Sequence, residues 1–350
     1  MIKAIIHKMA RQGLDCVLLS CASNISYLLG FNSRDALLLL SPKKKFYITD
    51  PRYSEEAKKK VKKDIDIKIV DYSIFDSVAR LCADLKSRRV GFEERYLNFA
   101  QYSKLKTSLK GKAALVPLSR FTEEFRAVKG PGELANIKKA ADIAASAFKF
   151  IKKNISCKKT ESEIASELEF FSKRKGASGP AFNTIVAFGT NSVFPHHLTG
   201  QRKLRDKGPV LIDFGVEYKG YKSDLTRVFF LGKITSEFKR IYDVVCRAQD
   251  RAIKEIKPGV FINKIDEVAR RYIAQQGYGG FFTHNLGHGI GIDVHEEPNI
   301  GPRTKERLKP GMVFTIEPAI YLPGRFGVRI EDMVLVTDRG AEIISGNLDK

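Results

Sequence analysis

The sequence of 350 residues contains no tryptophan, five cysteines and six histidines. The cysteines are scattered and odd in number, without a C-x-x-C pair, which is typical of a reducing compartment and argues against a thiolate metal site. No apolar run approaches the about 18 residues that a membrane helix needs. The N-terminus is interrupted by Lys3, His7, Lys8 and Arg11, unlike a secretion signal. We therefore expect a soluble, cytoplasmic protein that makes no membrane contact.

Acidic residues are also few relative to basic ones, 40 against 61, so the formal net charge is +21. Such a surface attracts anionic partners, among them nucleic acid. The lysines lie in short runs spread along the chain, such as 43–45 and 58–60, without interleaved aromatic residues or a nucleic-acid-binding signature. We interpret the charge as a solvated basic surface, with a functional electropositive patch as the alternative. A nucleic-acid partner is not expected.

The length suits about two domains. Residues 1–122 alternate short apolar runs with helix-like stretches, which predicts an α/β domain. Pro131 and Gly132 then open a long helix, so we place a second domain at 123–350. This domain repeats one theme, two helices followed by a hairpin, which predicts an α+β domain with an internal pseudo-twofold duplication. The two copies are helices at 132–153 and 161–175 with a hairpin at 210–231, and helices at 236–256 and 262–276 with a hairpin at 312–336.

Each expected hairpin carries two carboxylates that face each other. Asp213 falls opposite, or nearly opposite, Asp224 when the first hairpin folds about a turn at 218–220, and Glu317 faces Glu331 in the second. Like charges across a ladder are destabilising, and crowded carboxylates in a low-dielectric site cannot all ionise without a compensating charge. One pair alone would be read as solvated strand residues. Two pairs predict two divalent cations about 3.5 to 4 Å apart, an arrangement that recurs in hydrolytic enzymes.

The histidines gather in the same region, five of the six lying between residues 196 and 295. His284, His288 and His295 share one segment, and His196 follows a proline. The spacing of His284 and His288 would suit a helical zinc pair, but the glycines between and after them disfavour a helix and indicate backbone packed closely around a site. A single histidine is usually structural, whereas clustering near four acids favours a functional role.

These motifs resemble those of the M24-type metallopeptidases of the creatinase or "pita-bread" fold, and within them the Xaa-Pro dipeptidases (prolidases) and Xaa-Pro aminopeptidases. The resemblance covers nearly the whole chain, including Tyr27-Leu-Leu-Gly-Phe31 and Asp50-Pro-Arg-Tyr53 in the first domain. It implies an α/β N-terminal creatinase-like domain at 1–122, followed by an α+β pita-bread catalytic domain at 123–350.

The resemblance also implies a set of metal ligands. They belong to an aspartate that ends a strand and to the motifs S-D-x-T-R, G-H-G-I-G, T-I-E-P and V-R-I-E-D. In this sequence they are Asp213, Asp224, His288, Glu317 and Glu331. Asp224 and Glu331 are expected to bridge two divalent ions, with Asp213 on one metal and His288 with Glu317 on the other. An oxygen and nitrogen ligand set suits Mn²⁺ or Co²⁺, with Zn²⁺ as an alternative.

The implied mechanism is attack on the carbonyl before proline by a metal-bridging hydroxide, with Glu317 managing its proton. His196 and His295 resemble the family's catalytic, substrate-contacting histidines, and His284 has a lesser place in the same pocket. Arg303 and Arg329 are candidates for binding the free carboxylate of proline, because a guanidinium binds a carboxylate bidentately. A structural pairing is an equal alternative for both arginines.

The predicted function is hydrolysis of Xaa-Pro dipeptides. One alternative is an Xaa-Pro aminopeptidase that acts on longer peptides, and the compact chain favours the dipeptidase. An alternative of another class is a catalytically silent pita-bread module that binds nucleic acid or protein. The intact set of five ligands disfavours that module. Relatives are commonly dimers, so a homodimer is expected.

Overall fold

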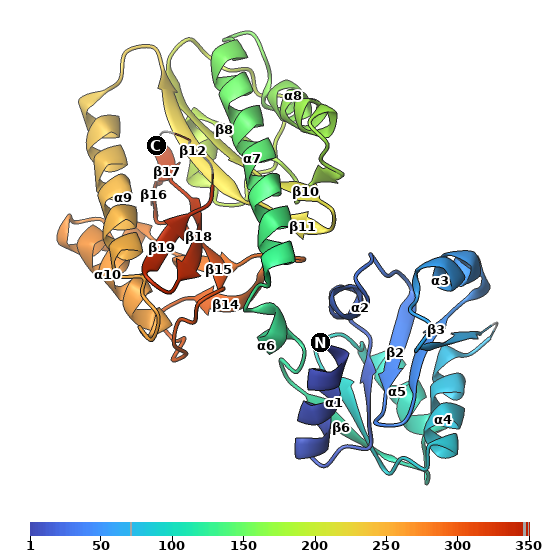
Figure 1. Cartoon of the computed structure of the whole chain (residues 1–350). Helices are drawn as coiled ribbons and strands as arrows, with labels where there is room; N and C mark the ends of the chain where they lie inside the picture. Colours follow the sequence, from blue (N-terminus) through green and yellow to red (C-terminus); the bar gives the residue numbers. More distant parts are fainter. Residues whose placement is uncertain (71, 346–347, 349) are drawn as a thin grey trace. The chain divides into compact units, whose positions relative to one another are not determined.

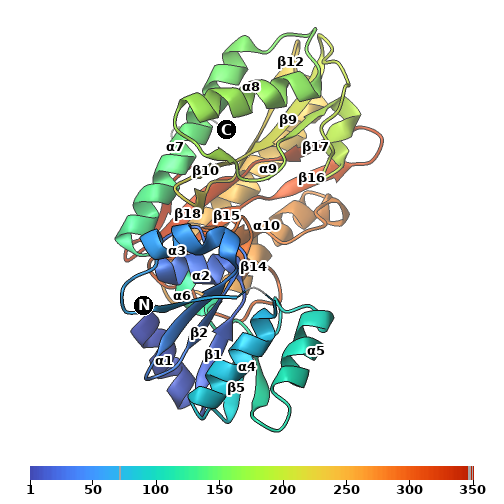
Figure 2. The same cartoon turned by 90° about the vertical axis from the view of Figure 1, so that its right-hand side faces the viewer.

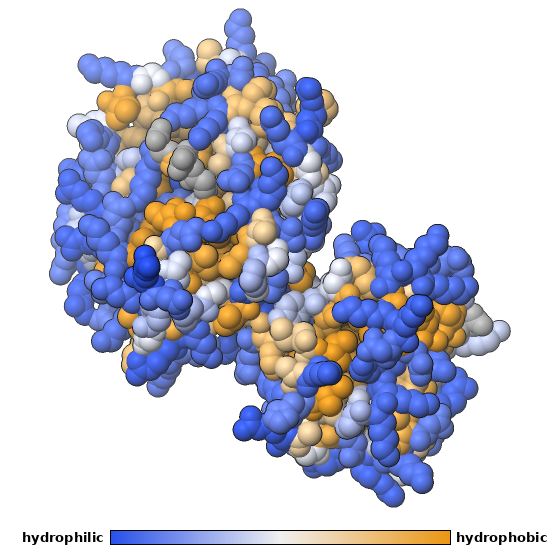
Figure 3. All heavy atoms as spheres, viewed as in Figure 1, coloured by the Kyte–Doolittle hydropathy of each residue, from blue (hydrophilic) through white to orange (hydrophobic). Residues whose placement is uncertain are grey.

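The computed structural model describes residues 1–70, 72–345, 348 and 350 of the chain. These residues form two compact units, Met1–Phe125 and Arg126–Lys350, coloured blue to cyan and green to red in Figure 1. No helix in this described part of the chain is long and apolar enough to cross a membrane. Hydrophilic side chains cover much of the visible face of each unit (Figure 3), and the lysines at 43–44 and 58–60 are exposed.

The first unit is built on a six-stranded sheet in the order β4-β3-β2-β1-β5-β6. The strands are β1 (Cys16–Leu19), β2 (Ala36–Leu40), β3 (Lys45–Thr49), β4 (Asp66–Ile69), β5 (Arg89–Glu93) and β6 (Ala114–Leu118). The helices are α1 (Ile2–Arg11), α2 (Ala22–Leu29), η1 (Pro51–Tyr53), α3 (Ser54–Lys60), α4 (Ile74–Asp84) and α5 (Phe99–Ser108). A short helix, α6 (Glu123–Arg126), leads out of this unit.

Helices cover both faces of this sheet. In β1, Val17 and Leu19 belong to the apolar cluster that includes α1 and α2, whereas Cys16 and Leu18 belong to the cluster that includes α4 and α5. A strand buried on both faces reads as a continuous apolar run rather than an alternating one. The α/β prediction for the N-terminal domain is therefore confirmed, and the physical signal was these uninterrupted apolar runs.

The second unit contains the predicted duplication (Figures 1 and 2). Its first half comprises α7 (Pro131–Asn154), α8 (Glu161–Arg174), β7 (Gly179–Pro180), β8 (Ile185–Phe188), η2 (Gly189–Val193), β9 (Gly208–Phe214), β10 (Val216–Tyr218), β11 (Tyr221–Lys222) and β12 (Leu225–Leu231). Its second half comprises α9 (Ser236–Lys254), α10 (Ile262–Gln275), η3 (Gly279–Phe281), β13 (Gly287–Gly289), β14 (Glu296–Ile300), β15 (Val313–Ile316), β16 (Ala319–Leu322), β17 (Phe326–Arg329), β18 (Asp332–Thr337) and β19 (Gly340–Ile343). Each half is a helix pair followed by antiparallel strands, as predicted.

The helices of this unit begin where the sequence signals predicted. Pro131 occupies the first turn of α7, where its missing N–H costs no hydrogen bond. At α8, Thr160 accepts from the N–H of Glu163 and the Glu163 side chain accepts from the N–H of Thr160, which makes a capping box.

Each helix pair of the second unit packs against strands of both halves. Helices α7 and α8 share an apolar cluster with Ile212 of β9 and Met333 of β18, whereas α9 and α10 share another with Leu211 of β9 and Val334 of β18. A backbone hydrogen bond of 3.1 Å, from the N–H of Glu331 to the carbonyl of Thr226, joins the two halves. That joint lies at the end of β18 where the predicted acids converge.

Candidate metal centre

The first hairpin places Asp213 and Asp224 on one face of the strand pair. Its turn has two residues, Lys219 and Gly220, both with positive φ (48° and 80°), which suits the twist of a hairpin. The register pairs Asp213 with Thr226. Asp224 precedes Thr226 by two residues, so it lies diagonally across from Asp213 on the same face. A directly opposite position is therefore wrong for this pair, and the nearly opposite one is right.

The second hairpin places Glu317 directly opposite Glu331. The ladder of β15 and β18 ends at the pair Ile316 and Asp332, and the ladder of β16 and β17 resumes at Ala319 and Arg329. Both ladders share one register, in which Glu317 and Glu331 are partners across the short gap. The predicted face-to-face pair is confirmed, and the ladder bonds are interrupted at this pair.

His288 lies in the short strand β13 and not in a helix, as the surrounding glycines indicated. A Cβ atom on Gly287 would lie 1.9 Å from the carbonyl oxygen of Thr315, and one on Gly289 would lie 2.3 Å from that of Glu297. Only glycine permits so close an approach. The glycines therefore pack β13 between β14 and β15, which directs the His288 side chain at the acids.

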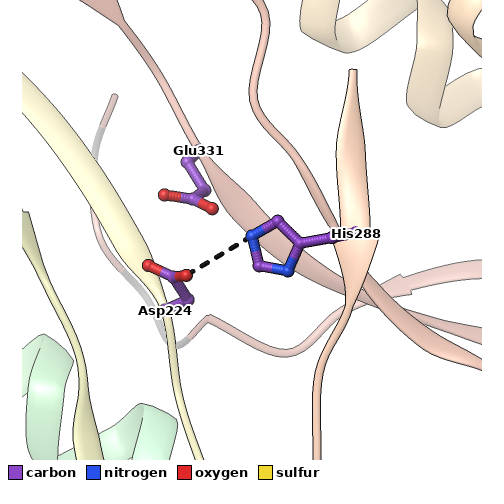
Figure 4. A group of neighbouring side chains, drawn as sticks. All are labelled: Asp224, His288 and Glu331. Carbon is purple, nitrogen blue, oxygen red and sulfur yellow. Dashed lines mark ion pairs between the residues drawn. The ribbon is translucent and has the colours of Figure 1, made fainter. Parts of the chain in front are cut away.

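Three of the five predicted ligands form a cluster. Asp224, His288 and Glu331 each offer one ligand atom, and these atoms all lie within 4.8 Å of one another. Figure 4 shows the three side chains converging from three separate segments. His288 Nε2 lies 3.6 Å from Asp224 Oδ2 and 3.5 Å from Glu317 Oε1, so Glu317 borders the cluster beside His288.

The acids are buried at a marked electrostatic cost. Burial, followed by the charge of Glu331, raises the pKa of Asp224 and of Glu317 well above the usual range of a carboxyl. Burial, followed by the charge of Asp213, raises the pKa of Glu331 to about 8. Within the described residues, Asp213 Oδ1 and Asp224 Oδ1 are buried and have no hydrogen-bond partner.

Unpartnered buried carboxylate oxygens are rare, because they forfeit the hydrogen bonds that water would supply. A divalent cation would satisfy these oxygens and offset the repulsion among the acids. The residues present therefore fit divalent metal ions, and the mixture of carboxylate oxygen with one imidazole suits Mn²⁺, Co²⁺ or Zn²⁺.

Asp213 is connected to the cluster by hydrogen bonds of Arg329 and Thr226. The Arg329 Nη2 donates to Asp213 Oδ2 over 2.6 Å, and its Nε donates to Thr226 Oγ1 over 3.1 Å. Its Nη1 donates to the hydroxyl of Tyr321 over 2.6 Å. Arg329 thus reaches the predicted metal ligands, as its position two residues before Glu331 indicated. Its proposed contact with a substrate carboxylate stays a prediction.

The remaining histidines lie beside the cluster. The rings of His288 and His295 are 4.1 Å apart, and His284 Nε2 lies 3.2 Å from the hydroxyl of Tyr321. Burial lowers the pKa of His284 to about 4 and of His288 to about 3, and it also lowers the pKa of His295. The charge of His196 adds to the lowering of the pKa at His284 and at His295.

Arg303, unlike the buried Arg329, has a solvent-exposed side chain. It lies in the turn that follows β14. An exposed arginine is free to swing toward a ligand, so its role as a carboxylate-binding residue stays a prediction.

Two residues of the site were not singled out from the sequence. Thr226 Oγ1 donates to Glu331 Oε2 over 2.7 Å and accepts from Arg329, and the hydroxyl of Tyr321 contacts both His284 and Arg329. The period of a strand could have found Thr226, because it follows Asp224 by two residues and shares its face. No local pattern marks Tyr321, whose partners come from distant segments.

Comparison with known families decides the class of protein. The sequence profile of metallopeptidase family M24 matches residues 135–338, more than half of the chain. The chain belongs to family M24. The profile of the creatinase/prolidase N-terminal domain matches residues 1–128. The predictions of a creatinase-like N-terminal domain, a pita-bread catalytic domain and a metallopeptidase are confirmed.

Members of family M24 resemble this chain over nearly its whole length. The Xaa-Pro dipeptidase of Pyrococcus horikoshii is 33% identical over 97% of this chain and 95% of its own. The structure of an Xaa-Pro dipeptidase from Bacillus anthracis superposes with a TM-score of 0.95 at 36% identity, covering 100% of this chain and 98% of the other. An X-Pro aminopeptidase from Thermotoga maritima superposes with a TM-score of 0.88 at 34% identity, covering 98% and 99%.

Proposed function

We propose that this member of family M24 is an Xaa-Pro dipeptidase that acts with two divalent metal ions, Mn²⁺ or Co²⁺. The ions are held by Asp213, Asp224, His288, Glu317 and Glu331. The convergence of Asp224, His288 and Glu331 within 4.8 Å carries the proposal, together with the two buried carboxylate oxygens that have no hydrogen-bond partner among the described residues. Similarity to the two Xaa-Pro dipeptidases supports the choice of substrate.

The metal ions, when bound, lower the pKa of water and polarise the carbonyl of the substrate. The chain supplies the other functions. Glu317 borders the cluster and takes up the proton of the attacking water. His295 has a lowered pKa, so its neutral ring offers one N–H to the carbonyl oxygen as negative charge develops there. His196 delivers a proton to the leaving nitrogen.

The substrate class poses a particular recognition problem. The bond before proline has no N–H, so a site that grips that donor cannot select it. A shaped pocket and a cation for the free carboxylate of a dipeptide replace the missing contact. Arg303 is the candidate for this cation, because its side chain is exposed, whereas the nitrogens of Arg329 donate to Asp213, Thr226 and Tyr321.

The assay that tests this function compares substrates after metal is stripped and then restored. With Mn²⁺ or Co²⁺ added back, we expect hydrolysis of Ala-Pro or Met-Pro and no hydrolysis of the tripeptide Ala-Pro-Ala. Free proline released from the dipeptide and Pro-Ala released from the tripeptide would be measured by chromatography. Faster cleavage of the tripeptide would instead identify an Xaa-Pro aminopeptidase, the activity named for the Thermotoga maritima relative. Metal-independent turnover would contradict the proposal.

We further propose that the enzyme is a cytoplasmic homodimer without a nucleic-acid partner. The five cysteines are all free, which supports a reducing compartment. Light scattering of the purified chain would measure its mass in solution.

A further inference from the structure

A buried carboxylate outside the metal centre lies at the base of the loop that carries His196. Glu161 is the first residue of α8, and its side chain is fully buried. An ionised carboxylate in the interior requires several donors to replace its lost hydration. The N-terminus of α8 favours negative charge at this position. The other donors all come from residues 188–200, the segment that contains His196.

Both oxygens of Glu161 are engaged by this segment. Oε1 accepts from the N–H of Phe188 over 2.9 Å and from Asn191 Nδ2 over 2.8 Å. Oε2 accepts from His197 Nε2 over 2.9 Å and from the N–H of Gly200 over 3.2 Å. The four donors include both ends of the segment and the residue next to His196. One carboxylate therefore closes the loop at its base.

The opposite side of the same loop is attached to β17. The N–H of Gly327 donates to Ser192 Oγ over 2.9 Å, and Arg329 Nη1 lies 3.4 Å from the carbonyl oxygen of Pro195. A Cβ atom on Gly327 would lie 2.0 Å from the carbonyl oxygen of Ser192, so the two segments are in close contact. The loop is thus held between α8 and β17, with Glu161 as its anchor on the α8 side.

We propose that Glu161 is a positioning residue that holds the loop at 188–200 in the conformation in which His196 contacts the substrate. This inference rests on the proposed function, because it assigns to His196 a contact with the reacting groups. Glu161 acts through the backbone of the loop and through His197. Only a carboxylate fits this place. A glutamine would turn an NH₂ group toward donors that need an acceptor, either at Phe188 and Asn191 or at His197 and Gly200.

The substitution Glu161→Gln tests the role, with Glu163→Gln as its matched control. Both changes remove one negative charge from the first turn of α8, but Glu163 is exposed and contacts the backbone of Thr160, a bond that glutamine can also make. We expect E161Q to lower kcat by about 10²-fold, since a misplacement of about 1 Å can cost that much. We expect E163Q to leave kcat unchanged.

A double-mutant cycle with His196→Ala separates positioning from general damage. If Glu161 acts through His196, the double variant E161Q/H196A is no slower than H196A alone. If the loss in E161Q comes from disruption elsewhere, the two losses multiply. Multiplicative losses would overturn the inference.

Hydrogen exchange of the metal-free protein gives a readout that does not depend on activity. We expect E161Q to speed exchange in peptides that cover residues 188–200, because the substitution weakens the hydrogen bonds to the N–H groups of Phe188 and Gly200. We expect E163Q to leave exchange in these peptides unchanged. Unchanged exchange there would overturn the inference. Wild-type chain that fails to hydrolyse any Xaa-Pro substrate would refute the proposed function instead, so the two failures are distinguishable.

Discussion

Asp224→Asn is expected to lower kcat/KM for an Xaa-Pro dipeptide by about 10³-fold, because metal activation of the substrate and water supplies several kcal/mol and each 1.4 kcal/mol is tenfold in rate. Asp224 is buried within 4.8 Å of both His288 and Glu331. The asparagine lacks the charge that a divalent ion requires there. The rate would be measured with saturating Mn²⁺ and compared with bound metal in the same samples.

The same substitution is expected to raise the thermal midpoint of the metal-free protein, by about 2 to 4 °C for each kcal/mol of repulsion relieved in a domain of this size. The pKa of Asp224 is raised by burial and by Glu331, so its ionised form is unfavourable in the folded state near pH 7 and the neutral asparagine removes that penalty. Asp338→Asn, an exposed change in the turn after β18, is the control and should alter neither quantity. A fully active D224N would contradict the proposed ligand role.

Arg227→Met is expected to destabilise the protein by about 3 to 5 kcal/mol, the usual cost of leaving one partner of a buried ion pair alone. Arg227 Nη2 donates to Asp332 Oδ1 over 2.6 Å, and both side chains are buried. Its Nη1 donates to the carbonyl oxygen of Glu331. The substitution therefore leaves the buried carboxylate of Asp332 without its positively charged partner. It also removes a hydrogen bond to the backbone of Glu331, a predicted metal ligand. Urea unfolding of the metal-free protein would measure the loss.

The matched control for this prediction is Lys239→Met. Lys239 pairs with Asp243 over 2.9 Å on the surface of α9, and exposed pairs four residues apart contribute only about 0.3 to 0.5 kcal/mol. If R227M and K239M lowered the free energy of unfolding equally, the buried ion pair would contribute no more stability than the exposed one, which would contradict the prediction.

Local chemistry explains which parts of the site could be predicted from the sequence. The opposite positions of Glu317 and Glu331 could be predicted, because side chains alternate with a period of two along a strand and the turn lies midway between the two residues. Register is sensitive to the length of the turn, and the first hairpin uses two turn residues, Lys219 and Gly220, rather than three. With three turn residues Asp213 would pair with Leu225, whereas the two-residue turn pairs it with Thr226 and leaves Asp224 diagonally across from it.

Long-range packing explains what the sequence did not reveal. The pairing of Asp213 with Arg329 joins residues 116 positions apart, and that of Arg227 with Asp332 joins residues 105 apart. Glu161 resembles any acid in the first turn of a helix until the fold brings the loop at 188–200 onto it. Side-chain partners of this kind depend on how the two halves of the second unit meet, which no short motif encodes.

Counting the metal ions tests the central claim most directly. Metal-free protein would be dialysed to equilibrium against Mn²⁺, and bound manganese would be measured by elemental analysis alongside D224N and D338N. The expected result is two manganese ions per wild-type chain, two in D338N and a clear loss in D224N. Wild-type protein that hydrolyses Xaa-Pro dipeptides at full rate while binding no divalent metal would contradict the claim.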